Sequence, residues 1–186
     1  MRAGTRVVFL CGSRRDGSAS RAVCATLIDA LPHGSGRLVE IGALPLYDPD
    51  LAPTAEVGAL LDGLTTAHGA VLVTPEYNHS ISGVLKNAID WASRPYLRSP
   101  LRDRPCLPVT VSGGGMGGVR AMAHLRQVLH GVMARAHPGP DLLVPDARAK
   151  VADGRLGPGP TRDRLEAGLA AFAAALPDRP VRPPAA

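Results

Sequence analysis

The sequence predicts one α/β domain, in which a parallel five-stranded sheet carries helices on both faces. Its 186 residues, 45% of them hydrophobic and 20% charged, suit a single globular domain. Short continuous apolar runs, typical of strands buried on both faces, alternate with segments whose apolar residues recur at helical spacing. Strands separated by helices favour a parallel sheet with helices packed on both sides.

Each expected strand is a short apolar run bounded by polar or glycine-rich residues. The first, TRVVFLC, is an almost continuous β-branched and aliphatic run. The expected strands cover residues 5–11, 36–41, 69–74 and 105–111, with a fifth strand split between 134–137 and 141–144. Pro75 follows the third run directly and is expected to stop that strand.

The expected helices begin at residues whose side chains can cap a helix. Ser18 or Ser20 is expected to cap the first helix, Thr54 the second and Thr161 the last. Two further helices are expected over residues 81–92 and 119–134. Residues 145–160, just before the last helix, are rich in glycine and proline and are expected to form a polar loop.

The composition limits the compartment and the partners. The net charge of +5 is spread along the chain, and aromatic residues make up only 3%, which argues against a nucleic-acid-binding face. No apolar stretch approaches the roughly 20 residues of a membrane span. Three cysteines without CxxC spacing indicate free thiols and a cytoplasmic protein, and no spacing typical of a metal site is present. The proline-rich residues 177–186 are expected to form a mobile tail after a domain of residues 1–176.

The segment after the first strand, GSRRDGSAS, combines hydroxyls, guanidiniums and a helix start. Ser13, Ser18 and Ser20 can donate hydrogen bonds, and either of the two arginines, Arg14 or Arg15, can hold a phosphate with two parallel hydrogen bonds. A helix N-terminus adds unpaired N–H groups and partial positive charge. These features favour a terminal phosphate, although a capped helix with solvated arginines remains the alternative.

Two more loops follow the third and fourth strands, at the sheet edge where ligands of such folds bind. Tyr77 offers a flat surface, and the Asn78 amide can both donate and accept hydrogen bonds. The alternative is that these residues form an ordinary turn with an Asn or Ser cap. Gly113, Gly115 and Gly118 have GxGxxG spacing, but a dinucleotide fingerprint belongs after the first strand. We therefore favour close approach of backbone N–H groups to a flat ring over a dinucleotide site.

The segments GSRRDGS, TPEYNHSISGVLKNAIDWASRP and SGGGMGGVRAMAHLRQVL resemble the NADPH-dependent FMN reductase family. That family has a flavodoxin-like fold and includes quinone, chromate and azo-dye reductases. The resemblance covers roughly residues 7–144. It implies a three-layer α/β/α sandwich with strand order 2-1-3-4-5, bound FMN, NADPH as electron donor, and a homodimer or homotetramer. The acceptor would be a quinone, an azo compound, a metal oxyanion or a free flavin.

The resemblance also assigns roles by position. It implies that the FMN phosphate is held by Ser13, Arg15, Ser18 and Ser20. It implies that the isoalloxazine ring is lined, largely through backbone groups, by Pro75, Glu76, Tyr77, Asn78, Ser112, Gly113 and Gly114. Arg14 stands where the family often has an aliphatic residue, so it faces solvent or the nicotinamide nucleotide.

The implied mechanism needs no nucleophilic side chain, because the flavin carries the redox chemistry. NADPH and the acceptor would use the same open flavin face in turn, which predicts ping-pong kinetics. Three alternatives remain open from the sequence. They are a flavodoxin-type electron carrier, a flavin-binding regulatory module and a Rossmann dehydrogenase that binds only a nicotinamide nucleotide.

Overall fold

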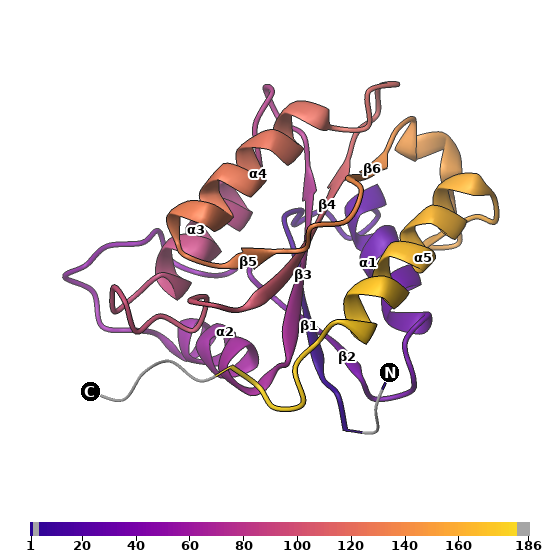
Figure 1. Cartoon of the computed structure of the whole chain (residues 1–186). Helices are drawn as coiled ribbons and strands as arrows, with labels where there is room; N and C mark the ends of the chain where they lie inside the picture. Colours follow the sequence, from indigo (N-terminus) through magenta and orange to yellow (C-terminus); the bar gives the residue numbers. More distant parts are fainter. Residues whose placement is uncertain (2–3, 182–186) are drawn as a thin grey trace.

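The computed structural model of the chain describes Met1 and residues 4–181. One parallel sheet forms its centre, with strand order β2-β1-β3-β4-β5 and with β6 pairing with β4 (Figure 1). The strands are β1 (Val7–Cys11), β2 (Gly36–Val39), β3 (Gly69–Pro75), β4 (Pro105–Val111), β5 (Arg135–Ala136) and β6 (Leu142–Val144). This order confirms the flavodoxin-like prediction, and the fifth strand is split as expected.

Within the described residues, five α-helices cover the sheet. They are α1 (Ala19–Asp29), α2 (Ala55–Thr66), α3 (Gly83–Ala92), α4 (Val119–Gly131) and α5 (Pro160–Ala174). Alternate residues of β1 belong to two separate cores: Val8 and Leu10 pack with α2, α3 and α4, whereas Val7 and Phe9 pack with α1 and α5. The period-2 alternation of strand side chains therefore produces the three-layer α/β/α sandwich.

Two predicted helix caps are confirmed and one is wrong. Ser18 Oγ accepts a hydrogen bond from the Arg21 N–H (3.2 Å), and Thr54 Oγ1 accepts one from the Val57 N–H (3.4 Å). Helix α5 begins at Pro160 after Gly159, without a side-chain cap, so Thr161 lies inside the helix. Proline suits this first position because its ring presets the helical φ and it lacks an N–H that would have no partner.

Pro75 does not stop the third strand. It pairs with Val111 at the end of β3, one residue beyond the expected boundary. Proline lacks only the N–H donor, and the N–H of the next residue, Glu76, donates to the Val111 carbonyl (3.0 Å). Pairing with β4 therefore runs to the edge where the loops of interest begin.

The expected loop at 145–160 contains regular structure. A short 3₁₀ helix, η1 (Ala147–Lys150), is followed by an antiparallel hairpin of β7 (Val151–Ala152) and β8 (Arg155–Leu156). Asp153 and Gly154, both with positive φ, form its turn, so the Asp-Gly pair was the available sequence signal. The Leu156 N–H donates to Thr26 Oγ1 (2.8 Å), which attaches the hairpin to α1.

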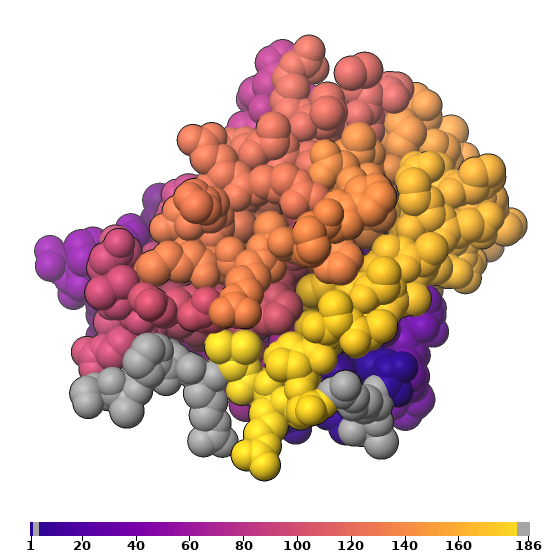
Figure 2. Space-filling view, viewed as in Figure 1, coloured from indigo at the N-terminus to yellow at the C-terminus, as the bar shows by residue number. Residues whose placement is uncertain are grey.

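Residues 175–181, after α5, pass near the amino-terminal ends of the strands (Figure 1) and lie on the lower surface in the space-filling view (Figure 2). Fully buried Arg104 donates to the carbonyls of Pro100 (3.1 Å), Ala67 and Val181 (2.6 Å), so it holds the first part of the predicted tail. The rest of that tail, residues 182–186, lies outside the described residues, and its mobility stays a prediction. No helix in the described part of the chain combines the length and apolar character that crossing a bilayer needs.

Candidate functional site: a pocket at the strand ends

A pocket of about 250 Å³ lies where β1, β3 and β4 end. The carboxyl ends of parallel strands share one edge of a sheet, so the three chemically unusual loops meet here as expected. Nine of the eleven predicted site residues line it: Ser13, Arg15, Ser18, Ser20, Pro75, Glu76, Tyr77, Ser112 and Gly113. Asn78 and Gly114 are adjacent in the chain but are not among the lining residues.

The loop after β1 presents donors and positive charge to this pocket. Ser13, Ser18 and Ser20 are buried near the start of α1, which Ser18 caps by accepting the Arg21 N–H. The Arg15 side chain is exposed and makes no hydrogen bond or ion pair with any described residue, although the Arg15 carbonyl accepts the Ser18 N–H (3.0 Å). The first turn of α1 carries no acid. The loop therefore has the hydrogen-bond donors and the free guanidinium that a phosphate group needs.

A neighbouring arginine is already paired. Arg21 Nη1 and Nη2 donate to the two oxygens of the Glu40 carboxylate at 2.9 and 2.7 Å, and this hydrogen-bonded pair lowers the pKa of Glu40. Because Arg21 is paired with Glu40, the arginine that this region presents to the pocket is Arg15.

The loop after β3 is a tight turn. Tyr77 and Ser80 exchange backbone hydrogen bonds of 3.0 and 2.9 Å, while Asn78 and His79 take positive φ at the tip. Ser80 Oγ is 2.7 Å from His124 Nδ1, which ties the turn to α4. This geometry leaves Tyr77 54% exposed beside the pocket and places the Asn78 backbone at the tip.

Glu76 has a structural contact that its predicted role did not include. Its Oε2 accepts hydrogen bonds from the backbone N–H groups of Arg120 and Ala121, both at 3.1 Å. Helix α4 begins after Gly118, which has no side chain to cap it. The carboxylate from β3 supplies this cap, so its charge is already stabilised by the helix N-terminus.

The glycine loop has two different halves. A Cβ at Gly113 or Gly115 would meet nothing within 4 Å, and one at Gly114 would meet only Ser112 Oγ, at 3.8 Å. Gly117 and Gly118 have positive φ of 64° and 87°, and a Cβ at Gly118 would lie 3.0 Å from Thr110 Cβ. The backbone itself requires glycine only in the second half, and the first half borders open space. A loop with hydrogen-bond donors and an unpaired guanidinium, beside an open glycine loop, suits FMN, which has a terminal phosphate and a flat ring.

Residues 5–149 match the model of the NADPH-dependent FMN reductase family. The chain belongs to this family. Its members use FMN and a nicotinamide nucleotide, so the protein is an oxidoreductase with FMN as cofactor and NAD(P)H as electron donor. The sequence-based recognition is confirmed.

Individual relatives support this assignment. The chain is 45% identical to a quinone reductase of Escherichia coli K12 over 130 residues, which are 67% of this chain and 69% of the relative. It is 37% identical to an NAD(P)H-dependent FMN reductase of Pseudomonas aeruginosa over 174 residues, covering 90% and 92%. Among solved structures, the NAD(P)H:acceptor oxidoreductase FerB of Paracoccus denitrificans superposes with a TM-score of 0.79 at 30% identity, covering 91% and 96%.

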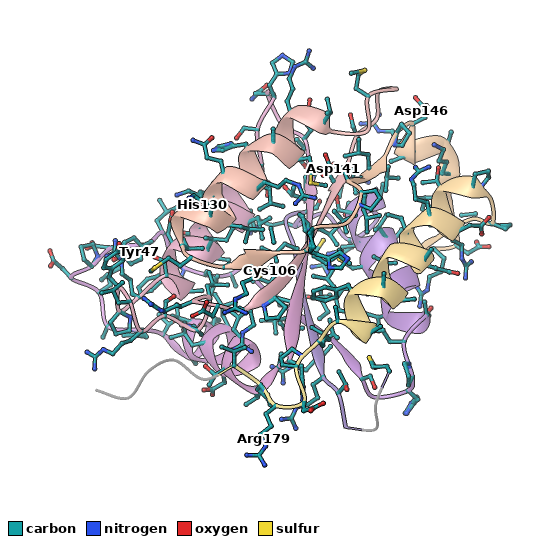
Figure 3. The ribbon with its side chains drawn as sticks, in the orientation of Figure 1. Tyr47, Cys106, His130, Asp141, Asp146 and Arg179 are labelled. Carbon is teal, nitrogen blue, oxygen red and sulfur yellow. The ribbon has the colours of Figure 1, made fainter. Side chains whose placement is uncertain are left out.

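In this FMN reductase, part of the pocket wall comes from a segment in which the sequence predicted no site residues. Ala147 and Arg148 of η1 line the pocket, and the Ala147 N–H donates to the Ser112 carbonyl (2.9 Å). Figure 3 shows Asp146, just before η1, at the edge where the strands end, and Arg179 at the opposite edge. Arg148 lies in a glycine- and proline-rich segment, where a single basic residue is a weak indication of a binding site. It reaches the pocket because β6 ends beside β4 and η1 follows directly.

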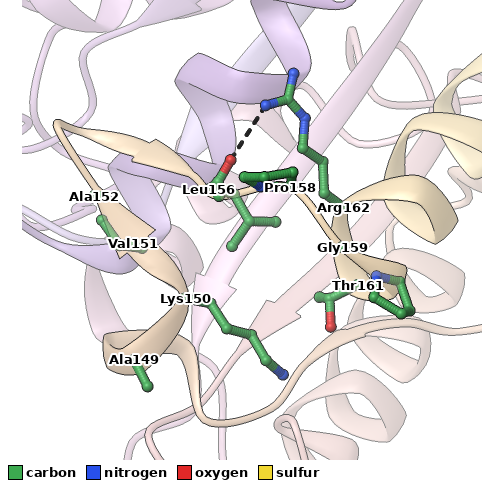
Figure 4. Close-up of a pocket in the computed structure, with 11 residues that line it drawn as sticks. Ala149, Lys150, Val151, Ala152, Leu156, Pro158, Gly159, Thr161 and Arg162 are labelled. Atoms are coloured by element: carbon green, nitrogen blue, oxygen red, sulfur yellow. Dashed lines mark hydrogen bonds between the residues drawn. The ribbon is translucent and has the colours of Figure 1, made fainter.

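A second pocket of about 280 Å³ lies between the β7–β8 hairpin and the start of α5 (Figure 4). Its basic groups already have partners. Lys150 Nζ donates to the Pro145 carbonyl (2.6 Å), and Arg162 donates to Glu166 (2.6 Å) and to the Leu156 carbonyl (3.4 Å). Its other lining groups are mostly aliphatic, glycine or proline. The strand-end pocket is therefore the better anion site.

Proposed function

We propose that this enzyme passes two electrons from NADPH through FMN to a small-molecule acceptor, with quinones as the main class. The observation that carries the proposal is the single pocket that joins the serine–arginine loop to the open glycine loop. The likeness to the E. coli quinone reductase supports quinones as acceptors. So does a 2-hydroxy-1,4-benzoquinone reductase of Burkholderia, which is 33% identical over 95% of this chain. Azo compounds, metal oxyanions and free flavins are further candidate acceptors.

The phosphate end of FMN is assigned to the loop after β1. Ser13 and Ser20 make no side-chain hydrogen bond with described residues, so both hydroxyls can donate to phosphate oxygens. Ser18 accepts from the Arg21 N–H and keeps its own hydroxyl proton for donation. Arg15 supplies charge-assisted hydrogen bonds.

The ring end is assigned to the loops after β3 and β4. Pro75, Glu76 and Tyr77 line one wall of the pocket, and Asn78 follows them in the chain. Ser112 and Gly113 line the other wall, and Gly114 is the next residue. The N–H groups of Gly113 and Gly115 make no hydrogen bond within the described residues, so they can stabilise negative charge on the pyrimidine side of the reduced ring. Bound FMN supplies the hydride chemistry, and the protein supplies orientation and electrostatics.

We infer that donor and acceptor bind in turn. In this assignment the loops after β3 and β4 lie against the bound ring, which leaves one ring face open to a second ring. NADPH and quinone would then stack in the same place on the exposed ring face. Steady-state kinetics should give parallel double-reciprocal lines, and intersecting lines would contradict this shared-site mechanism.

The experiment that tests the function is anaerobic reduction of the yellow holoprotein by NADPH, followed by a panel of acceptors. Direct two-electron bleaching and rapid reoxidation by a quinone would support the reductase. A flavodoxin-type carrier or a regulatory module would instead react slowly with NADPH. Reduction by dithionite in two separate one-electron steps would favour the carrier.

We also propose a homodimer or homotetramer in the cytoplasm. Leu51 and Tyr96, which are 49% and 65% exposed, line an apolar hollow of about 550 Å³, and Leu46, 82% exposed, precedes the lining residue Tyr47. A second copy could cover this surface. All three cysteines are buried free thiols, as expected in a reducing compartment. Sedimentation analysis would give the oligomeric state.

A further inference from the structure

The strand-end pocket contains two arginines without partners. Arg15 comes from the loop after β1, and Arg148 comes from η1, after β6. Both residues line the pocket, and the side chain of neither makes a hydrogen bond or ion pair with any described residue. Glu76 is the acid among the lining residues, and its carboxylate is held by the N-terminus of α4. The pocket therefore carries excess positive charge from two sides.

The position of Arg148 is fixed by backbone contacts of the two residues just before it. The Asp146 N–H donates to the Gly114 carbonyl (3.2 Å), and the Ala147 N–H donates to the Ser112 carbonyl (2.9 Å). The hairpin that follows is bonded to α1 through Leu156 and Thr26 (2.8 Å). These contacts hold η1 on the same face of the sheet as the start of α1, where Ser18 and Ser20 lie.

Charge matching identifies the ligand of this pair. A phosphate monoester carries about −1.5 to −2 at pH 7, so one guanidinium leaves it only partly compensated. Two guanidiniums match it, and each can donate two parallel hydrogen bonds. We propose that Arg148 is the second cationic ligand of the FMN phosphate, opposite Arg15, an inference that rests on the proposed function.

The test compares binding of FMN and riboflavin to FMN-depleted full-length protein. Arg148→Ala should weaken FMN binding by about tenfold or more, because a charge-assisted hydrogen bond is lost. Riboflavin, which lacks the phosphate, should bind the variant and the parent within about twofold. Arg148→Lys should fall between, since it keeps the charge and loses the planar fork. The matched control is Arg98→Ala, an exposed arginine outside this pocket, which should bind FMN like the parent.

Two further readouts separate phosphate contact from a general structural effect. FMN affinity should decline less steeply with salt in Arg148→Ala than in the parent, because one ion pair is missing. The ³¹P resonance of bound FMN should titrate at a higher pH in the variant, because the dianion loses a stabilising cation.

The outcomes distinguish the two levels of the proposal. A parent protein that binds no FMN would overturn the proposed function itself. A parent that binds FMN, with Arg148→Ala equal to it and Arg15→Ala weakened, would overturn the role of Arg148 alone. The same holds if Arg148→Ala keeps its FMN affinity and raises the KM for NADPH more than for NADH, since Arg148 would then contact the donor's phosphate.

Discussion

Glu76 and Ala121 join the two loops that enclose the proposed ring site. The Glu76 carboxylate, just beyond β3, accepts the Ala121 N–H at 3.1 Å in the first turn of α4. Helix α4 starts where the glycine loop ends, so this contact, with the one from the Arg120 N–H, helps to fix the loop after β3 relative to the loop after β4. An acid at a helix N-terminus also interacts favourably with the helix dipole.

Removing this cap should destabilise the domain. Glu76→Ala should lower the free energy of unfolding by about 1–2 kcal/mol, the usual effect of losing a helix cap. Glu76→Gln keeps one carbonyl oxygen as acceptor and should lose less. Urea denaturation followed by circular dichroism would measure both. Equal stability of Glu76→Ala and the parent would show that water replaces the carboxylate at no cost.

The two arginines of the first loop should differ in importance. Arg15 lines the pocket, whereas the Arg14 side chain packs near Gly42. Arg15→Ala should weaken FMN binding by about 10- to 150-fold, corresponding to roughly 1.5–3 kcal/mol for a charge-assisted hydrogen bond. Arg14→Ala is the matched control and should change it much less. Fluorescence titration with FMN and riboflavin checks the difference, and similar losses in both variants would contradict the assignment.

The glycine loop offers a matched pair of substitutions. Gly114→Val should fold like the parent and bind flavin weakly, because its Cβ meets only Ser112 Oγ within the protein and would block the ring. Gly118→Val should instead lose stability, because its φ of +87° and the nearby Thr110 both disfavour a side chain. Thermal melting and FMN titration of both variants separate the two effects. Normal flavin binding by Gly114→Val would assign the loop to another ligand.

Buried His68 should make the domain less stable in acid. Desolvation, with a smaller contribution from the positive charge of Arg6, lowers the pKa of His68, and its Nδ1 accepts the Arg6 N–H (3.0 Å). The unfolded chain, with a histidine pKa of about 6.5, then binds the proton more tightly than the folded one. Stability therefore falls as the pH drops below about 6.5.

His68→Asn tests this dependence, because asparagine can accept the same hydrogen bond but does not titrate. The variant should show a flatter decline in stability between about pH 6.5 and 5, measured by urea denaturation. His137, whose pKa is also lowered by desolvation, stays in both proteins and accounts for the remaining slope. An unchanged slope would mean that His68 is solvated when protonated.

Most strands and helices, and the edge of the sheet where the site lies, could be predicted from local sequence patterns. Strand boundaries came from apolar runs, such as Pro105–Val111, and the caps Ser18 and Thr54 act within three residues of their own positions. The meeting of the three loops followed from parallel strand direction alone. These features depend on contacts between near neighbours or on chain direction, both of which a sequence displays.

Other features depended on which distant groups pack together. Nothing in the sequence distinguishes Arg21 from Arg15 and Arg148 as an ion-pair partner. In the structure Arg21 pairs with Glu40, whereas Arg15 and Arg148 line the pocket without a side-chain partner among the described residues. Glu76 caps a helix that begins more than forty residues later in the chain. Buried Arg104 joins carbonyls from three segments. A long side chain can reach several partners, and its choice is settled only when the sheet and its covering helices place one of them within hydrogen-bond distance.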